Sequence, residues 1–397
     1  MAEDRLFILL LVLLLGYTYL GYPLLLWLLA RLFPKSHRCD LKYRPSVTLI
    51  ISAYNEAQVI EEKIVNSLAL DYPREKLTVL VVSDCSDDGT DQLVCRYADL
   101  GIRLLRAPEH RGKTAALNLA LAATTSELVI FSDANAIYQQ DAIRQLVRHF
   151  SDDRIGYVVG HARYREEKES AAGGTESLYW DLETRIKLWE SAFSSVVGGD
   201  GAIYAIRRSL YEPLLESDIN DFVNPLQIVA KGYRGVFEPR AVCYEQPAGA
   251  FDKEFGRKVR IVNRSFNGLL RVRQALNPVR VGFFSWQLVS HKLLRWFSPY
   301  LAATLLVLML HDTVRGGRHL LDLVSLTSAA GMLAAAGIGW LLRGRAHGGK
   351  VWFLPYYFVL MNLAMALGIY HRLRGRTITT WSTVRSQAPG SSWRGGN

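Results

Sequence analysis

The apolar positions of the chain are first gathered in one long stretch near its N-terminus. Residues 6–30 carry no charged side chain, and Arg31 is the first charge that follows. A helix crosses a bilayer with about 20 apolar residues. The apolar core of a signal peptide has only roughly 7–15 and precedes a small-residue cleavage site, and no such site follows here. The pattern therefore predicts a retained transmembrane anchor over residues 1–33.

Three further apolar segments lie near the other end of the chain, at about 291–311, 320–342 and 351–370. The first contains Arg295 near its end, where a long side chain can reach the headgroups. We expect three transmembrane helices over residues 291–371 and a basic tail over 372–397.

Basic residues predict the orientation in the membrane. Several cations follow the first span, namely Lys35, Arg38, Lys42 and Arg44, whereas the preceding stub is nearly balanced. Positive charge is retained on the cytoplasmic side, so the region between the membrane segments is expected in the cytoplasm, beneath an inner or plasma membrane. For the tail, the count of three spans after the domain favours the side of the membrane opposite the domain, whereas the arginines of the tail favour the same side as the domain. We favour the opposite side, on span count.

Between the membrane segments, short apolar runs alternate with helical patterns. Strands are expected at 46–53, 77–83, 102–107 and 128–132, and helices at 57–70, 89–100 and 112–124. The strands are apolar throughout, which is typical of a parallel sheet covered on both faces. We therefore predict an α/β domain with a mostly parallel sheet over residues 40–254.

Polar clusters follow three of these strands, namely Tyr54-Asn55-Glu56, the run from Asp84 to Thr90, and Asp133-Ala134-Asn135. One such cluster is usually a turn or a helix cap, and Asp87, Asp88 and Thr90 suit capping. Ligands of open α/β sheets bind beyond the carboxyl ends of the strands, so three clusters at one edge favour a ligand site.

The chemistry of this edge favours a metal and a diphosphate. Neither common phosphate-binding loop is present. Asp133 and Asn135 offer two oxygen ligands on one side of an extended segment, and such ligands suit a hard divalent cation. Lys113, at the start of a helix, suits a phosphate. These residues predict displacement at a nucleotide–diphosphate linkage.

The net charge and the cysteines restrict the possible ligands and partners of the chain. The net charge of +10 suits anionic lipid headgroups or a phosphorylated substrate, and without a recognisable nucleic-acid motif we expect no nucleic-acid partner. The four cysteines show neither a disulfide framework nor metal-ligand spacing.

Seven segments together resemble the inverting, membrane-integrated glycosyltransferases of family 2, which include cellulose, chitin and hyaluronan synthases. They are AYNEA (53–57), VVSDCSDDGT (81–90), HRGKTAALN (110–118), FSDANA (131–136), GGDGAIYAIRRSLY (198–211), NDFVNPLQIVAKGYRGVFEPRAVCYE (220–245) and RKVRI (257–261). The resemblance runs from about 46 to 261 in the family's order. It implies a GT-A-type domain, a UDP-sugar donor and a divalent cation, Mg²⁺ or Mn²⁺.

The resemblance also implies a role for individual residues. Asp221 corresponds to the general base, and Asp133 and Asn135 to the metal motif. The GGDGA loop, with Gly199, Asp200 and Gly201, corresponds to the acceptor site. The expected donor-binding residues are Tyr54, Glu56, Asp84, Lys113, Arg257 and Arg260.

Three departures from the family pattern are visible. Asn135 replaces the second acid of the metal motif, and Asn220 replaces the acid before Asp221. Without that like-charged neighbour, we expect a lower pKa for Asp221 than in the usual pair. Around Arg260, Arg257 and Ile261 replace the Gln and Trp of a motif associated with processive synthesis.

The segment 255–273 has an amphipathic helical pattern. One face carries Phe255, Val259, Val262, Phe266, Leu269 and Leu270, and the opposite face carries Arg257, Arg260, Arg264 and Arg271. Together with the aromatic-rich stretch 281–297, it predicts interfacial helices over 255–290, with arginines facing the active-site mouth.

The sequence thus predicts an inverting glycosyltransferase that forms a β-linkage on a glycan or a membrane lipid, in polysaccharide synthesis. A non-processive enzyme that adds one sugar to a lipid carrier is the alternative. A transporter component with a nucleotide-sensing domain is a further alternative, although the few polar groups within the spans count against it.

Overall fold

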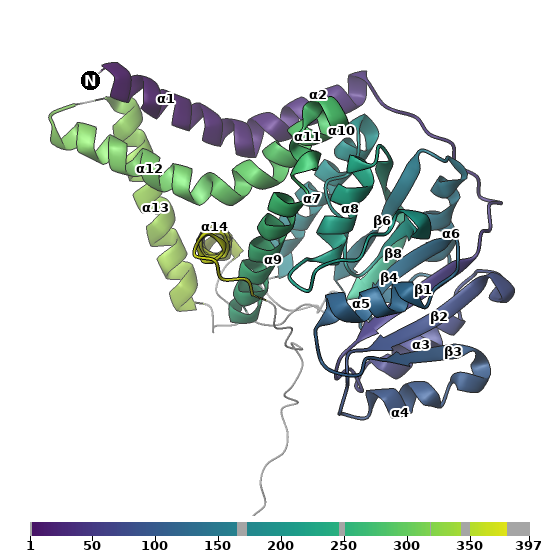
Figure 1. Ribbon diagram of the computed structural model, residues 1–397. Helices are drawn as coiled ribbons and strands as arrows, with labels where there is room; N and C mark the ends of the chain where they lie inside the picture. The colour runs from purple at the N-terminus through teal and green to yellow at the C-terminus, as the bar shows by residue number, and fades with distance from the viewer. Residues whose placement is uncertain (1, 165–172, 246–250, 318, 343–349, 379–397) are drawn as a thin grey trace, which may run out of the picture.

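The computed structural model describes residues 2–164, 173–245, 251–317, 319–342 and 350–378. A central α/β domain lies beside a group of long apolar helices (Figure 1). This arrangement confirms the fold class predicted from the pattern of apolar runs.

The sheet is built around the four strands expected from the sequence: β1 (Val47–Ala53), β2 (Leu77–Ser83), β3 (Ile102–Arg106) and β4 (Leu128–Asp133). They are parallel, and β1 lies between β2 and β4, with Ser52 paired to Asp133. The three polar strand ends therefore do meet at one edge of the sheet.

Four more strands extend the sheet beyond β4: β5 (Ile137–Tyr138), β6 (Ile155–Tyr164), β7 (Tyr204–Arg207) and β8 (Arg234–Glu245). The order is β3-β2-β1-β4-β7-β6-β8-β5, with β7 antiparallel to both β4 and β6. The sheet is therefore mixed in its second half.

Helices cover both faces of the sheet. Helices α3 (Ile60–Leu68), α4 (Thr90–Cys95) and α6 (Ala142–Val147) pack on one face, and α5 (Lys113–Ala122) and α8 (Asn220–Ala230) pack on the other. Along β1, Leu49 and Ile51 belong to the core on the face covered by α3, α4 and α6, and Ile50 belongs to the core on the face covered by α5 and α8. Since alternate side chains point to opposite faces, continuous burial explains why these strands are apolar throughout.

Among the described residues, four helical segments are long and apolar enough to cross a membrane: Asp4–Leu32, Phe283–Val314, Leu320–Leu342 and Val351–Leu373. The first joins α1 (Ala2–Gly16) to α2 (Tyr22–Leu32), and the second joins α11 (Phe283–Leu288) to α12 (Leu294–Val314). The others are α13 (Leu320–Leu342) and α14 (Lys350–Leu373). The stretch 281–297 is therefore mostly the start of one long helix and not a separate interfacial piece.

Helix α9 (Phe251–Arg271) has the expected amphipathic pattern, but protein covers its apolar face. Phe266 contacts the ring of Trp296 at 6.4 Å between centroids. Gly368 of α14 lies against Val262, where a β-carbon would come within about 3 Å of the valine side chain. The helix is thus wedged between the catalytic domain and the apolar helices.

The C-terminal segment that follows α14 returns to the catalytic domain. Asn263 of α9 donates hydrogen bonds to the carbonyls of Gly368 (3.2 Å) and Arg376 (3.0 Å) and accepts one from Ile378 N–H (3.1 Å). The prediction that the tail lies opposite the domain is therefore wrong for residues 372–378. The remainder of the tail lies outside the described residues.

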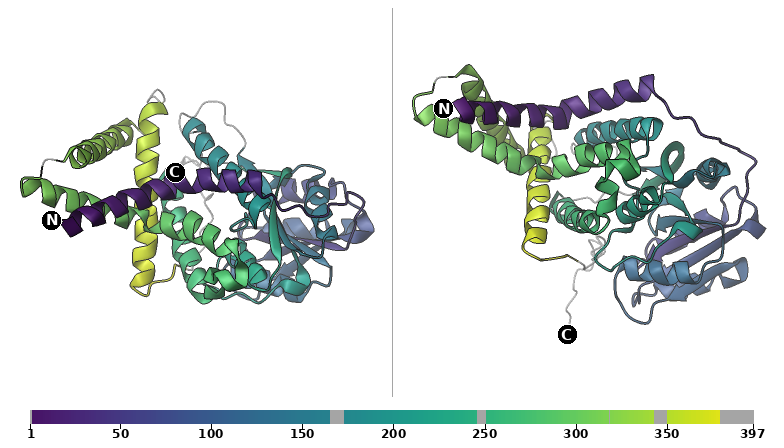
Figure 2. Two further views of the ribbon diagram at one scale, coloured as in Figure 1. Left: turned by 90° about the horizontal axis from the view of Figure 1, so that it is seen from above. Right: turned by 45° about the horizontal axis from the view of Figure 1, so that its top comes forward.

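The helix arrangement gives the reason for this error. Asp322, at the start of α13, pairs with Arg5 at 2.6 Å, so α13 begins beside the N-terminus. Helix α14 runs across α1 (Figure 2) and ends on α9. Helix α14 packs on α13 and along α9, so the chain comes back beside the catalytic domain, and counting apolar segments does not predict this packing.

Candidate active site

A cavity of about 410 Å³ opens beyond the carboxyl ends of β1 and β4. It contains every residue expected at the site except Tyr54 and Asp84, namely Glu56, Lys113, Asp133, Asn135, Gly199, Asp200, Gly201, Asp221, Arg257 and Arg260. Residues separated by up to about 200 positions in the sequence are thus brought to one edge of the sheet.

Asp133 is the last residue of β4, and its carboxylate points into this cavity. Its Oδ1 atom accepts a hydrogen bond from Ser52 Oγ at 3.3 Å and forms an ion pair with Lys113 Nζ. Burial disfavours the charged form of Lys113, but the carboxylates of Asp133 and Asp221 outweigh it and raise the pKa of Lys113. Lys113 is therefore a permanent positive charge beside the expected metal ligand.

The GGDGA loop presses its backbone against the start of α8. Gly199 N–H donates to Asp221 O at 2.5 Å, and a β-carbon on Gly199 would lie 2.8 Å from the same oxygen. A β-carbon on Gly201 would lie 3.3 Å from Asp221 Oδ2 and 3.5 Å from Lys113 Nζ. Glycine at positions 199 and 201 therefore permits the close approach of the loop to Asp221 and Lys113.

Asp221 lies in the first turn of α8, and its Oδ1 atom is buried with no hydrogen-bond partner among the described residues. An unsatisfied buried carboxylate oxygen is costly and calls for a functional explanation. Burial raises the pKa of Asp221, Lys113 offsets part of that rise, and Asp200 and Asp133 add to it.

The acids that act on Asp221 are not its neighbours in the sequence. Asn220, which lines the same cavity, is uncharged, and its Nδ2 donates to the hydroxyl of Tyr204 at 2.8 Å. The like charges that act on Asp221 come from Asp200 and Asp133, which lie far from it in the sequence. The comparison with the family's acid pair stays a prediction, while in this structure burial, Asp200 and Asp133 together raise the pKa of Asp221.

Asp84 and Tyr54 support the site from outside the cavity. The buried carboxylate of Asp84 accepts the N–H groups of Arg111 (3.1 Å) and Gly112 (2.7 Å) and contacts His110 Nδ1 at 2.8 Å. The ring of His110 stacks on Tyr54, with centroids 4.0 Å apart. Asp84 therefore fixes the loop that leads into Lys113, and its expected contact with the donor stays a prediction.

Sequence reasoning missed Glu245, the last residue of β8, which lines the same cavity. Burial, together with the charges of Asp133 and Asp200, raises the pKa of Glu245 to about 8. Lys187 of α7 (Gly173–Phe193) was also missed, and its Nζ lies 3.5 Å from Asp200 Oδ2. Glu245 is the last residue of a motif quoted for the family resemblance. Its position at the edge of the sheet, however, depends on the register of β8.

The oxygen donors of this cavity fit a divalent cation. Asp133 and Asn135 supply carboxylate and amide oxygens, and Asp200 and Glu245 add acidic groups within the same walls. Mg²⁺ and Mn²⁺ prefer such oxygen ligands. Burial is the main cause of the raised pKa of Glu245, and the charges of Asp133 and Asp200 add to it, so these acidic groups lie close enough to interact.

A second cavity, of about 340 Å³, adjoins the first and reaches between the apolar helices. The two share Lys187, Gly199, Ile219, Asp221, Lys258, Ile261 and Lys292. Beyond these residues the second cavity is lined mainly by apolar side chains such as Trp296, Phe358 and Met361. Asp221 therefore lies where a polar cavity meets an apolar one.

Comparison with known proteins defines the class of this domain. The family model described as glycosyl transferase family 2 matches residues 48–215, which contain β1 to β4, β7 and the GGDGA loop. The central domain of the chain is thus a family 2 glycosyltransferase domain with a GT-A-type fold, flanked by candidate membrane-spanning helices.

Individual relatives share this domain. The poly-beta-1,6-N-acetyl-D-glucosamine synthase of Staphylococcus aureus (strain COL) is 27% identical over 227 residues, 53% of this chain and 54% of that protein. The probable glycosyltransferase YdaM of Bacillus subtilis (strain 168) is 27% identical over 224 residues, 53% of this chain and 52% of that protein. The chain therefore spans about half the length of the curated relatives it matches.

A solved structure resembles nearly the whole chain. The mannosyltransferase PcManGT from Pyrobaculum calidifontis, in complex with GDP-Man and Mn²⁺, superposes with a TM-score of 0.70 and 25% identity. The match covers 92% of this chain and 99% of that chain. The likeness therefore extends beyond the catalytic domain to the apolar helices.

Proposed function

We propose that the chain is an inverting, metal-dependent glycosyltransferase that moves a sugar from a nucleoside diphosphate to a hydroxyl group at the membrane surface. The observation that carries this proposal is the position of Asp221. Its Oδ1 atom has no hydrogen-bond partner in the described part of the chain and lies where the polar cavity meets the apolar one, between the expected places of donor and acceptor.

Asp221 accepts the proton of the acceptor hydroxyl as that oxygen attacks the anomeric carbon. A single displacement inverts the configuration, so an α-linked donor gives a β-linked product. Lys113, Arg257 and Arg260 line the donor side of the cavity and offset the charge that develops on the leaving diphosphate. Asp133 and Asn135 would hold Mg²⁺ or Mn²⁺, which supplies further positive charge for the same leaving group.

Two donors are proposed. The family resemblance supports a UDP-sugar, and the synthase relative is named for a poly-N-acetylglucosamine product. GDP-mannose is the second candidate, because the solved structure that matches nearly the whole chain is a mannosyltransferase in complex with GDP-Man.

The apolar cavity supports a lipid-borne acceptor. It is enclosed by side chains of α9, α12 and α14, and Lys258, Lys292 and Arg295 place positive charge at its polar end. A hydrophobic tail fits the apolar part, and its head can reach Asp221. Either a growing glycan held at the membrane or a single-sugar lipid carrier satisfies this geometry, and we propose a cytoplasmic position for the domain in both cases.

The test is a donor screen with the purified full-length protein in lipid nanodiscs. A panel of UDP- and GDP-sugars is supplied with Mn²⁺ and a membrane lipid extract, and released nucleotide and lipid-linked product are measured. Release with one donor, together with a product heavier by one sugar or by a ladder of sugars, supports the proposal. The ladder indicates processive synthesis and the single addition a lipid-carrier transferase. Nucleotide binding without release from any donor contradicts the proposal and favours a sensing component of a transporter.

A further inference from the structure

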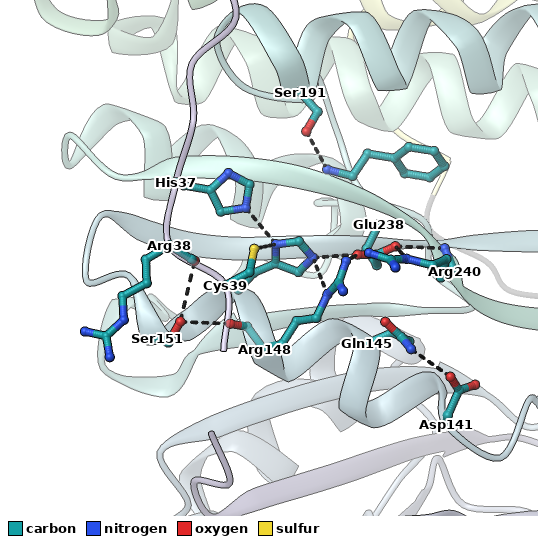
Figure 3. Close-up of polar contacts among 12 residues, drawn as sticks. His37, Arg38, Cys39, Asp141, Gln145, Arg148, Ser151, Ser191, Glu238 and Arg240 are labelled. Atoms are coloured by element: carbon teal, nitrogen blue, oxygen red, sulfur yellow. Dashed lines mark hydrogen bonds and ion pairs between the residues drawn. The ribbon is translucent and has the colours of Figure 1, made fainter. Parts of the chain in front are cut away.

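A second group of metal-ligand side chains lies apart from both cavities. His37 and Cys39 belong to the segment that joins α2 to β1, and His149 belongs to the 3-10 turn Arg148–Ser151. One ligand atom from each lies within 4.8 Å of the other two. Figure 3 shows His37 and Cys39 on this connecting segment, facing the side of the domain that carries Arg148 and Glu238.

His149 is the centre of this group. Its Nδ1 lies 2.7 Å from Nε2 of His37 and 3.3 Å from Sγ of Cys39. Its Nε2 lies 2.8 Å from Oε2 of Glu238. Because a carboxylate only accepts hydrogen bonds, the proton of His149 belongs on Nε2. The lone pair of Nδ1 is therefore directed at His37 and Cys39.

This arrangement is the one by which proteins prepare a histidine for a metal. A ligating imidazole usually donates its other N–H to a carboxylate, which fixes both ring orientation and tautomer. Glu238 is itself buried and held by Arg148 and by the N–H of Arg240 at 2.9 Å.

We propose that His37, Cys39 and His149 bind one Zn²⁺ ion, with Glu238 positioning His149. Two imidazoles and a thiolate are typical zinc ligands, with bonds of about 2.0–2.1 Å to nitrogen and about 2.3 Å to sulfur. Tetrahedral geometry with these bonds separates two nitrogens by about 3.3 Å and nitrogen from sulfur by about 3.6 Å. The observed 2.7 and 3.3 Å thus need to widen by less than 1 Å.

The connecting segment is irregular and is already held against the domain. Residues 34–40 form no helix or strand, and Cys39 is exposed. The segment is already tied to the domain, since Asp40 N–H donates to Arg148 O at 3.0 Å and Arg38 N–H to Asp152 Oδ2 at 3.1 Å. A zinc ion here would fasten the first membrane helix to the catalytic domain, and the exposed side leaves a fourth position for water.

Metal content distinguishes this site from the catalytic one. Tagless full-length protein is dialysed against Zn²⁺ with excess Mg²⁺, and bound zinc is counted by mass spectrometry. Co²⁺ replacement then reports on the thiolate through sulfur-to-cobalt charge-transfer absorption, which the oxygen ligands of the catalytic cavity do not give. We expect one zinc per chain and a charge-transfer band, both lost in Cys39→Ser and retained in the matched control Cys95→Ser, whose exposed cysteine lies elsewhere.

A second variant tests the positioning role of Glu238. Glu238→Gln keeps a hydrogen-bond acceptor but removes its charge, and a change of this kind lowers metal affinity by about 10–100-fold. Absence of stoichiometric zinc in the native protein overturns the proposal. So does a charge-transfer band that persists in Cys39→Ser. Either result leaves a hydrogen-bonded cluster in which His149 Nδ1 accepts from His37 and Cys39.

Discussion

The carboxylate of Asp221 lies against the α-carbon of Gly201, so that a β-carbon at Gly201 would stand 3.3 Å from Oδ2 of Asp221. The same β-carbon would lie 3.5 Å from Lys113 Nζ. A residue with any side chain at position 201 therefore occupies space between the proposed base and the cation beside the metal ligand.

We expect Gly201→Ala to reduce kcat/KM without unfolding the domain. The added methyl group displaces Asp221 by a few tenths of an ångström, and since a misplacement of about 1 Å costs on the order of 10²-fold in rate, we expect a loss of roughly several-fold. Steady-state kinetics and thermal melting measure the two effects. Gly331→Ala, in α13 with no atom near its would-be β-carbon, is the control. Equal activity of the two variants would show that the loop does not border the reacting groups.

Asp221→Asn should reduce sugar transfer by on the order of 10²-fold or more, in the range expected for loss of a general base, and leave donor binding nearly intact. Calorimetric titration with the donor and turnover assays separate the two quantities. Asp153→Asn, at an exposed position, is the control. If binding disappears together with turnover, Asp221 is a donor ligand. If turnover survives, the base lies elsewhere, and Asp200 is the next candidate.

Asp133→Asn should abolish metal-stimulated turnover, because the strand-end carboxylate is replaced by an uncharged amide. Asn135→Asp should retain activity and change the preference between Mg²⁺ and Mn²⁺, because it adds a charged oxygen ligand. Both effects are measured as turnover against metal concentration, with folding checked by circular dichroism. Full activity of Asp133→Asn without added metal would contradict the assignment.

Lys63 gives a prediction about pH and stability. Its side chain is fully buried, donates to the carbonyl of Ala136 and lies 3.9 Å from the centre of the Tyr138 ring. Burial lowers the pKa of Lys63 to about 7, from an ordinary value of 10.5. Between these values the unfolded chain binds more protons than the folded one, so stability rises with pH. This contribution is present above pH 10.5 and is lost as the pH falls through about 7.

Lys63→Met should therefore flatten the rise of stability between pH 7 and 9, where one such group contributes at most about 1.4 kcal/mol per pH unit. Chemical unfolding at several pH values measures the slope. Lys42→Met, at an exposed position, should leave it unchanged. A native slope equal to that of Lys63→Met would mean that Lys63 stays charged in the fold.

Strands β1 to β4 could be predicted because a strand that is buried on both faces is apolar throughout its length. Val129, Ile130 and Phe131 are all buried, two in one core and one in the other, so the run has no polar interruption. The strand ends then place Asp133 without further information. Strand β8 has no continuous apolar run, because Pro239 and Arg240 interrupt it. Glu245 at the end of this strand was therefore missed.

Contacts between distant segments could not be predicted from spacing. His37 and Cys39 are two positions apart, but His149 reaches them only because its turn packs under the connecting segment. Likewise, the contact of residues 376–378 with Asn263 depends on the packing of α14 along α9, which hydropathy does not encode.

The meeting of the two cavities at Asp221 has a kinetic consequence. A donor that enters the polar cavity arrives from water, and its concentration is counted per volume. A lipid-borne acceptor arrives from the bilayer, and its availability is counted per lipid molecule. Diluting the acceptor with inert lipid at fixed total amount then slows the reaction, whereas diluting the whole suspension with donor-containing buffer leaves the rate per enzyme unchanged. For such an enzyme, the composition of the membrane acts as a substrate concentration.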